Sequence, residues 1–149
     1  MVFVFGLILL ALLTCLSWVD FRTCRLPDIL TLPLIAAGLV QAYSGGFFLA
    51  GLIGAVAGYS VFVGIELLFK RIRKKDGLGR GDAKLLAAGG AWVGWMFLPF
   101  IVMIGSSLGL IAAMFPSMRN RTGSGHIPFG PFLALAIFIV WAAGHFARR

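Results

Sequence analysis

The sequence has 149 residues, of which 60% are hydrophobic and 12% are charged, and its formal net charge at pH 7 is +8. A soluble domain has about 25% charged residues, so the composition excludes an ordinary soluble protein and indicates an integral membrane protein. The length fits a single domain, residues 1–149, without a separate soluble module. The basic residues lie in short loops between apolar runs. We therefore interpret them as topology signals and contacts with anionic lipid, and not as a nucleic-acid site.

Apolar runs of membrane-spanning length predict an all-α, polytopic bundle of about six transmembrane helices. The expected spans are residues 2–19, 29–43, 47–69, 83–98, 100–115 and 128–147, with Pro99 separating the fourth from the fifth. Three G-x-x-x-G pairs, at 54/58, 90/94 and 105/109, favour close helix packing. The first run lacks a basic start and an A-x-A-like cleavage site, so we expect it to remain as a span.

The distribution of basic residues predicts the orientation of these spans. Six spans place the loops at 20–28, 70–82 and 116–127 on one face of the membrane. All of the 13 Lys and Arg residues except Arg148 and Arg149 lie in these loops or directly beside them. The positive-inside rule therefore makes this face cytoplasmic and places both termini outside.

Two of the five acidic residues are expected at the same membrane depth. Asp20 ends the first predicted span and Asp82 begins the fourth, both at the cytoplasmic edge. Two facing carboxylates cannot easily both ionise, so they share a proton. The ionised one can then activate water while the protonated one polarises a carbonyl group, without a metal or cofactor. Asp20 and Asp82 are therefore the candidate catalytic pair.

Four of the five acidic residues, all except Asp76, also have a structural interpretation. Asp82 could cap the fourth helix, and Asp20 could pair with Arg22 or Arg25, although an acid at a helix C-terminus opposes the macrodipole. Asp28, which follows Pro27, is expected to be a helix N-cap. Glu66 and Lys70 are expected to form an i, i+4 ion pair at the membrane edge.

The residues around Asp82 suggest a loop that can approach a substrate strand. Glycines alternate through Gly77, Gly79 and Gly81, which leaves the backbone free to turn sharply. The lysine two positions after Asp82 could anchor the helix at the interface or meet a substrate carboxylate. The candidates for substrate binding or loop support are Gly79, Arg80, Gly81 and Lys84.

Other catalytic and metal-binding patterns find little support. The sequence has no G-x-S-x-G motif, and His126 and His145 are expected on opposite faces of the membrane. Cys15 and Cys24 form no C-x-x-C pair, so a zinc site is not predicted.

Three segments resemble those of the type IV prepilin peptidases, in the same order along the chain. The segment around Asp20 and Leu26-Pro27-Asp28 resembles the family's first-aspartate segment. Residues 79–88, GRGDAKLLAA, resemble the G-x-G-D-x-K-L-L segment, and residues 127–134, IPFGPFLA, resemble the segment that opens the last helix. G-x-G-D alone is weakly specific, but the three segments together are highly specific.

This resemblance implies a catalytic pair at Asp20 and Asp82, and a substrate. The substrate would be a prepilin or pseudopilin, whose basic leader is cut at the cytoplasmic face of the inner membrane, usually after a glycine. Larger family members carry a cytoplasmic region with paired cysteines that is associated with N-methylation. Here the first span leads almost directly into Asp20, so we expect a short form without methyltransferase activity.

Two alternatives remain open at this stage. A small transporter or pore could use acidic residues as a proton relay, but these would be expected near mid-membrane and not at its edge. A non-catalytic subunit of a pilus-assembly machine would differ from the enzyme only in an activity test.

Overall fold

The structure, a computed structural model, describes residues 2–23, 26–73, 80–114 and 129–147. Within these ranges it consists of helices joined by short turns, so the expected all-α class is confirmed. The elements in chain order are α1 (Val2–Thr23), α2 (Asp28–Ser44), α3 (Phe48–Arg73), α4 (Arg80–Val93), the 3-10 helix η1 (Trp95–Phe97), α5 (Leu98–Met114) and α7 (Gly130–Ala147).

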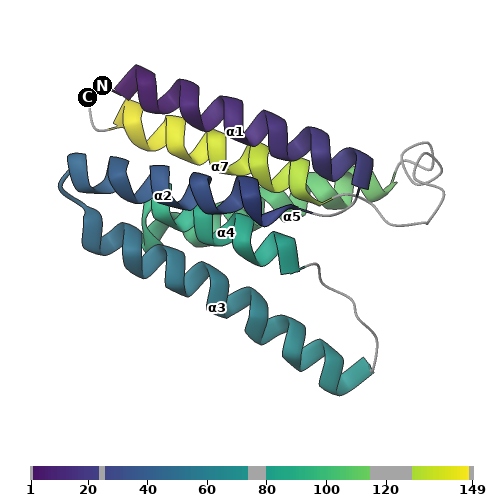
Figure 1. Cartoon of the computed structure of the whole chain (residues 1–149). Helices are drawn as coiled ribbons and strands as arrows, with labels where there is room; N and C mark the ends of the chain where they lie inside the picture. Colours follow the sequence, from purple (N-terminus) through teal and green to yellow (C-terminus); the bar gives the residue numbers. More distant parts are fainter. Residues whose placement is uncertain (1, 24–25, 74–79, 115–128, 148–149) are drawn as a thin grey trace.

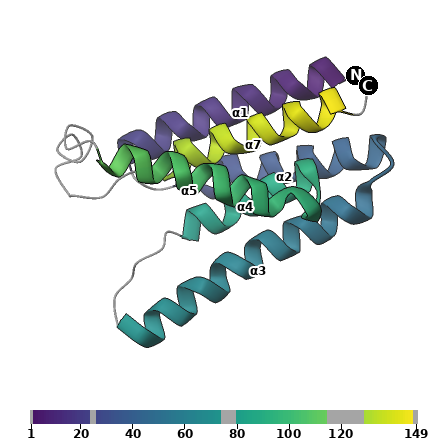
Figure 2. The same ribbon diagram turned by 180° about the vertical axis from the view of Figure 1, so that it is seen from behind.

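The helices form a bundle in which the chain crosses repeatedly from one end to the other (Figures 1 and 2). At one end α1, α3 and α5 finish and α2, α4 and α7 begin; we call this the charged end. The two chain termini and the turn between α2 and α3 lie at the opposite end, here called the far end. The predicted alternation of the chain between two faces is therefore present in the fold.

The outward surface is apolar, as expected of a bundle in lipid. Large side chains that are 66% to 81% exposed occur on α1, α2, α3 and α5, for example Phe3, Leu7, Ile29, Leu49 and Met114. The stretches Phe3–Thr23, Phe48–Ile72 and Trp95–Met114 are long and apolar enough to cross a membrane, and Asp28–Ser44 and Gly130–His145 are shorter apolar helices. The chain is a multi-pass membrane protein.

Helix α4 occupies the interior of this bundle. From Ala83 to Gly94 every residue except Lys84 is buried, and α4 contacts α2, α3, α5 and α7. Its 14 residues span roughly 21 Å, which is less than the thickness of a bilayer core of about 30 Å. It is therefore surrounded mainly by protein, and its small residues, alanine and glycine, suit that position.

Glycines allow α3 and α4 to approach until their backbones touch. A Cβ atom on Gly90 would collide with the carbonyl oxygen of Gly54, and a Cβ on Gly58 would lie 2.8 Å from the carbonyl oxygen of Leu86. On α5, a Cβ on Gly105 would lie 3.1 Å from a side-chain carbon of Leu133 on α7. The expectation that the G-x-x-x-G pairs mark close packing is confirmed at these contacts.

Two predicted boundaries were wrong, each for a local reason. Helix α1 does not stop at Asp20 but continues to Thr23, whose hydroxyl donates to the carbonyl oxygen of Val19. The break between the fourth and fifth helices is not at Pro99. It lies at Gly94, whose φ of 86° only glycine adopts easily, whereas Pro99 sits in the first turn of α5, where no helical N–H is needed.

The α3–α4 contact gives a test of the fold. We expect Gly90→Ala to destabilise the protein by about 1–3 kcal/mol, because the added methyl group forces two packed backbones apart. Thermal unfolding in detergent should show a lower midpoint for this variant. Gly64→Ala on α3 is the matched control, because a Cβ there meets nothing within 4 Å. Equal stability of the two variants would contradict the packing described.

Candidate functional site

Asp20 is a buried carboxylate at the charged end of the bundle. Its side chain lies on the last turns of α1 and is only 5% exposed. Its Oδ2 atom accepts a hydrogen bond of 3.0 Å from the backbone N–H of Gly130, the first residue of α7. The two residues are 110 positions apart in the sequence, so this bond joins the first and last helices of the chain.

Asp82 approaches Asp20 from the central helix. It lies in the first turn of α4, ahead of the apolar part of that helix, and is partly buried. Burial raises the pKa of Asp82 to about 7, and the charge of the neighbouring Asp20 carboxylate adds to this rise. The structure thus brings the two aspartates near enough for the charge of one to oppose ionisation of the other.

The segments around the aspartates also pack against each other. A Cβ atom on Gly81 would lie 2.8 Å from the Cβ of Leu26, so the missing side chain lets the start of α4 rest on the segment before α2. Next to this contact, the Lys84 ammonium group forms an ion pair with the Asp28 carboxylate. Lys84 therefore joins α4 to α2.

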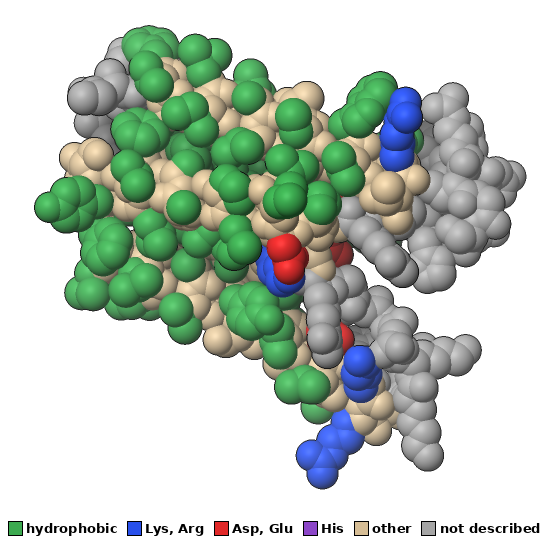
Figure 3. All heavy atoms as spheres, viewed as in Figure 1, with side chains coloured by type: hydrophobic (Ala, Val, Ile, Leu, Met, Phe, Trp, Pro, Cys, Tyr) green, Lys and Arg blue, Asp and Glu red, His purple; other side chains and the backbone are tan. Residues whose placement is uncertain are grey.

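The other predicted site residues lie partly or wholly outside the described residues. Arg80 begins α4, and its side chain lies outside the described residues. Gly77 and Gly79 lie outside the described residues altogether. Figure 3 shows that, on the face it displays, the described Lys, Arg, Asp and Glu side chains gather at the charged end.

The structural interpretations of the acids have mixed outcomes. Glu66 does pair with Lys70, at 3.5 Å. Asp28 is not an N-cap: Pro27 occupies that position without a side-chain cap, because α2 begins at Asp28 itself, whose carboxylate binds Lys84. Asp82 is not an N-cap either, since α4 starts two residues earlier, at Arg80.

The proposed ion pair of Asp20 is not found where it can be examined. The guanidinium group of Arg22 lies over the Trp18 ring, 5.1 Å from its centroid, whereas Arg25 is outside the described residues. Within the ranges that the structure describes, the polar partner of Asp20 is the amide of Gly130.

Gly130 is the residue that the sequence-based site did not include. Its segment resembled the family's last-helix motif, but a glycine without a side chain gave no chemical reason to select it. The signal was its position, because a helix begins there and free N–H groups at a helix N-terminus bind carboxylates.

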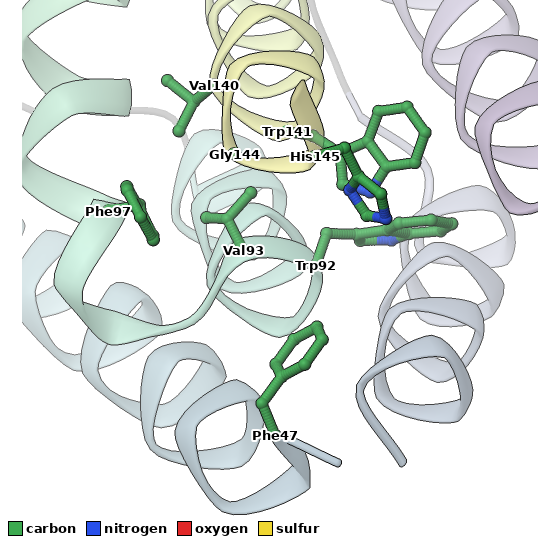
Figure 4. A pocket seen from close by; sticks show the side chains of 8 residues that line it. All are labelled: Phe47, Trp92, Val93, Phe97, Val140, Trp141, Gly144 and His145. Atoms are coloured by element: carbon green, nitrogen blue, oxygen red, sulfur yellow. The ribbon is translucent and has the colours of Figure 1, made fainter. Parts of the chain in front are cut away.

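The described structure also holds a small pocket at the far end of the bundle (Figure 4). Aromatic side chains dominate its lining, including Trp92, Phe97 and Trp141, with His145 at its side. Trp92 follows Asp82 by ten positions on the same helix, which places the pocket roughly 15 Å from the aspartates. The lining contains no carboxylate, so this pocket cannot supply the acid pair. Among the described residues, no three His, Cys, Asp or Glu side chains are arranged to hold a metal ion.

The environment of Asp82 makes stability depend on pH. Because the pKa of Asp82 in the folded protein lies above the ordinary value of 3.8, folding becomes less favourable as pH rises from about 4 to about 7. We expect Asp82→Asn, which cannot ionise, to raise the unfolding temperature by a few degrees near pH 8 and to change it little near pH 4. An Asp82→Asn effect that is equal at both pH values would contradict this environment.

Comparison with known proteins identifies the family of the chain. Residues 7–114 match the type IV leader peptidase family. Proteins named prepilin leader peptidase/N-methyltransferase are similar over most of the chain. The protein from Aeromonas hydrophila is 43% identical over 141 residues, which are 91% of this chain and 49% of that protein. That from Neisseria gonorrhoeae is 43% identical over 140 residues (93% and 48%), and that from Escherichia coli K12 is 47% identical over 126 residues (83% and 56%).

The chain thus spans about half the length of these curated relatives. No solved structure matches it. The matched residues include Asp20 and Asp82, with all of α4 and with α1 from Leu7 onward. The chain belongs to the type IV leader peptidase family.

Proposed function

We propose that this protein is a membrane aspartic endopeptidase that removes the basic leader from type IV prepilins or pseudopilins. The observation that carries the proposal is the approach of Asp20 and Asp82 at one end of the bundle, in a chain of the leader peptidase family. Asp20 is buried against α7 and Asp82 lies at the start of α4, so both side chains come from rigid elements that can hold them in register.

The chemistry follows from the shared proton of two neighbouring carboxyl groups. The ionised group accepts a proton from water as the water oxygen attacks the scissile carbonyl carbon, and the protonated group donates to the carbonyl oxygen. When the tetrahedral intermediate collapses, the leaving amine receives a proton and the pair returns to its starting state. No metal or cofactor is required for these steps.

We further propose that the charged end faces the cytoplasm, with both chain termini outside the inner membrane. The support is the concentration of Lys and Arg in the loops at that end. Cytoplasmic loops of membrane proteins are enriched in these residues. A basic leader would then be cut on the side where pilin precursors are made. The same basic residues would contact anionic lipid headgroups of the inner leaflet.

The positions of the acids favour hydrolysis over a proton relay. A relay needs carboxylates near mid-membrane, whereas Asp20, Asp28 and Asp82 all lie at the charged end. The relatives' names also state an N-methyltransferase activity, but the chain spans only about half of those proteins. We assign the peptidase alone to residues 1–149, because the aspartate pair lies within them.

The pair of aspartates is tested by leader removal. We expect Asp20→Asn and Asp82→Asn each to abolish cleavage of a co-expressed prepilin, because neither asparagine can carry or exchange the shared proton. A gel assay for the processed pilin measures this, and membrane content of each variant shows that the protein is still made. Asp76→Asn is the control that should keep most activity, and Asp28→Asn should be tolerated better than a change at either member of the pair. Full cleavage activity of either the Asp20→Asn or the Asp82→Asn variant would rule out the catalytic pair.

The role of Lys84 is tested by reversing its ion pair. We expect Lys84→Asp to reduce cleavage, because it places like charges together between α2 and α4. The double variant Asp28→Lys/Lys84→Asp should recover activity if the pair supports the site. If Lys84 binds a substrate carboxylate instead, the double variant stays impaired, and only a charge reversal at that acid of the pilin restores cleavage.

A further inference from the structure

The two aspartates have unequal surroundings, although they form one pair. The Oδ2 atom of Asp20 accepts the N–H of Gly130 at 3.0 Å. Gly130 opens α7, so this N–H is one of the free donors at a helix N-terminus, where the macrodipole is positive. A charge-assisted bond of this kind favours a carboxylate over a protonated carboxyl group.

Only glycine allows this contact. A Cβ atom at position 130 would lie 2.5 Å from Oδ2 and 2.9 Å from Cγ of Asp20. The φ of Gly130 is not positive, since the positive values among the described glycines belong to Gly46 and Gly94. The requirement for glycine at position 130 is therefore one of space beside the carboxylate, and not of backbone conformation.

The surroundings of Asp82 favour its protonated form. It is partly buried, and the negative charge of Asp20 opposes its ionisation. The amide partner of Asp20 and the charge that faces Asp82 therefore favour the same division of roles, with Asp20 as the carboxylate.

We propose that Gly130 is a positioning residue that fixes the two roles: its N–H holds Asp20 as the carboxylate that activates water, and Asp82 is the proton donor. This rests on the proposed peptidase function. In the first step the water proton passes to Asp20 while the Asp82 proton passes to the substrate carbonyl oxygen, and the C–O bond forms. In the second step the C–N bond breaks, the Asp20 proton passes to the leaving amine, and a hydroxyl of the intermediate returns a proton to Asp82.

The dependence of kcat/KM on pH separates this role from a structural one. Protonation of Asp20 sets the acidic limb and ionisation of Asp82 sets the basic limb. We expect Gly130→Ala, which displaces the carboxylate, to move the acidic limb upward by about one pH unit and to leave the basic limb in place. Gly130→Pro, which also removes the N–H, should move it further. Gly144→Ala on the same helix is the matched control, because a Cβ there meets nothing within 4 Å.

A lower rate with both limbs unmoved in Gly130→Ala would overturn the proposal, as would a shift of the basic limb alone. In that case a wild-type protein that still cleaves prepilin would leave the peptidase function intact. Absence of cleavage by the wild-type protein would instead count against the proposed function itself.

An infrared measurement decides the question without an assay of cleavage. Asp82→Asn protein, carrying ¹³C-labelled aspartate in an ester-free detergent, isolates the titration of Asp20 from that of its partner. Near pH 7 we expect only carboxylate bands in this variant, and a protonated carboxyl band when Gly130→Ala is added. A protonated carboxyl band in Asp82→Asn alone would show that the amide does not hold Asp20 ionised.

Discussion

The hydrogen bond from the Gly130 amide to the Asp20 carboxylate is the contact on which the charged end depends. A carboxylate that is 5% exposed needs a polar partner, since burial without one is costly. Here the partner is the N-terminus of α7, which offers N–H groups that the helix itself cannot use. The bond satisfies both groups and fixes α7 beside α1, so the first and last helices close the bundle around the central one.

The central position of α4 determines where the second carboxylate can lie. Gly54, Gly58 and Gly90 let α3 and α4 touch through their backbones, and α4 also packs against α2, α5 and α7, so it lies inside the bundle with its first turn at the charged end. The contact of Gly81 with Leu26 and the ion pair of Lys84 with Asp28 then hold that turn against α2. Small residues thus let α4 lie inside the bundle, and the ion pair of Lys84 with Asp28 fixes the start of α4 against α2.

Apolar runs and positive charges in the sequence were sufficient to predict the helices, their alternation and the common end for the acids. These features depend on patterns along one segment at a time, which a sequence shows directly. Details that depend on two segments meeting were not predicted. Asp28 was expected to cap its helix because the position of Lys84 was unknown, and Gly130 was overlooked because its function lies in a backbone N–H. The break at Gly94 was assigned to Pro99, since a proline in a first turn and a proline that ends a helix look alike in sequence.

The central claim is that Asp20 and Asp82 face each other closely enough to share a proton. Cysteine cross-linking tests it most directly, in a chain whose Cys15 and Cys24 have been replaced by alanine. The account predicts that Asp20→Cys and Asp82→Cys form a disulfide on mild oxidation in the membrane, as should Leu26→Cys and Gly81→Cys used as the positive control, because a Cβ at position 81 lies beside the Cβ of Leu26. A control pair that cross-links while the 20–82 pair does not would contradict the account.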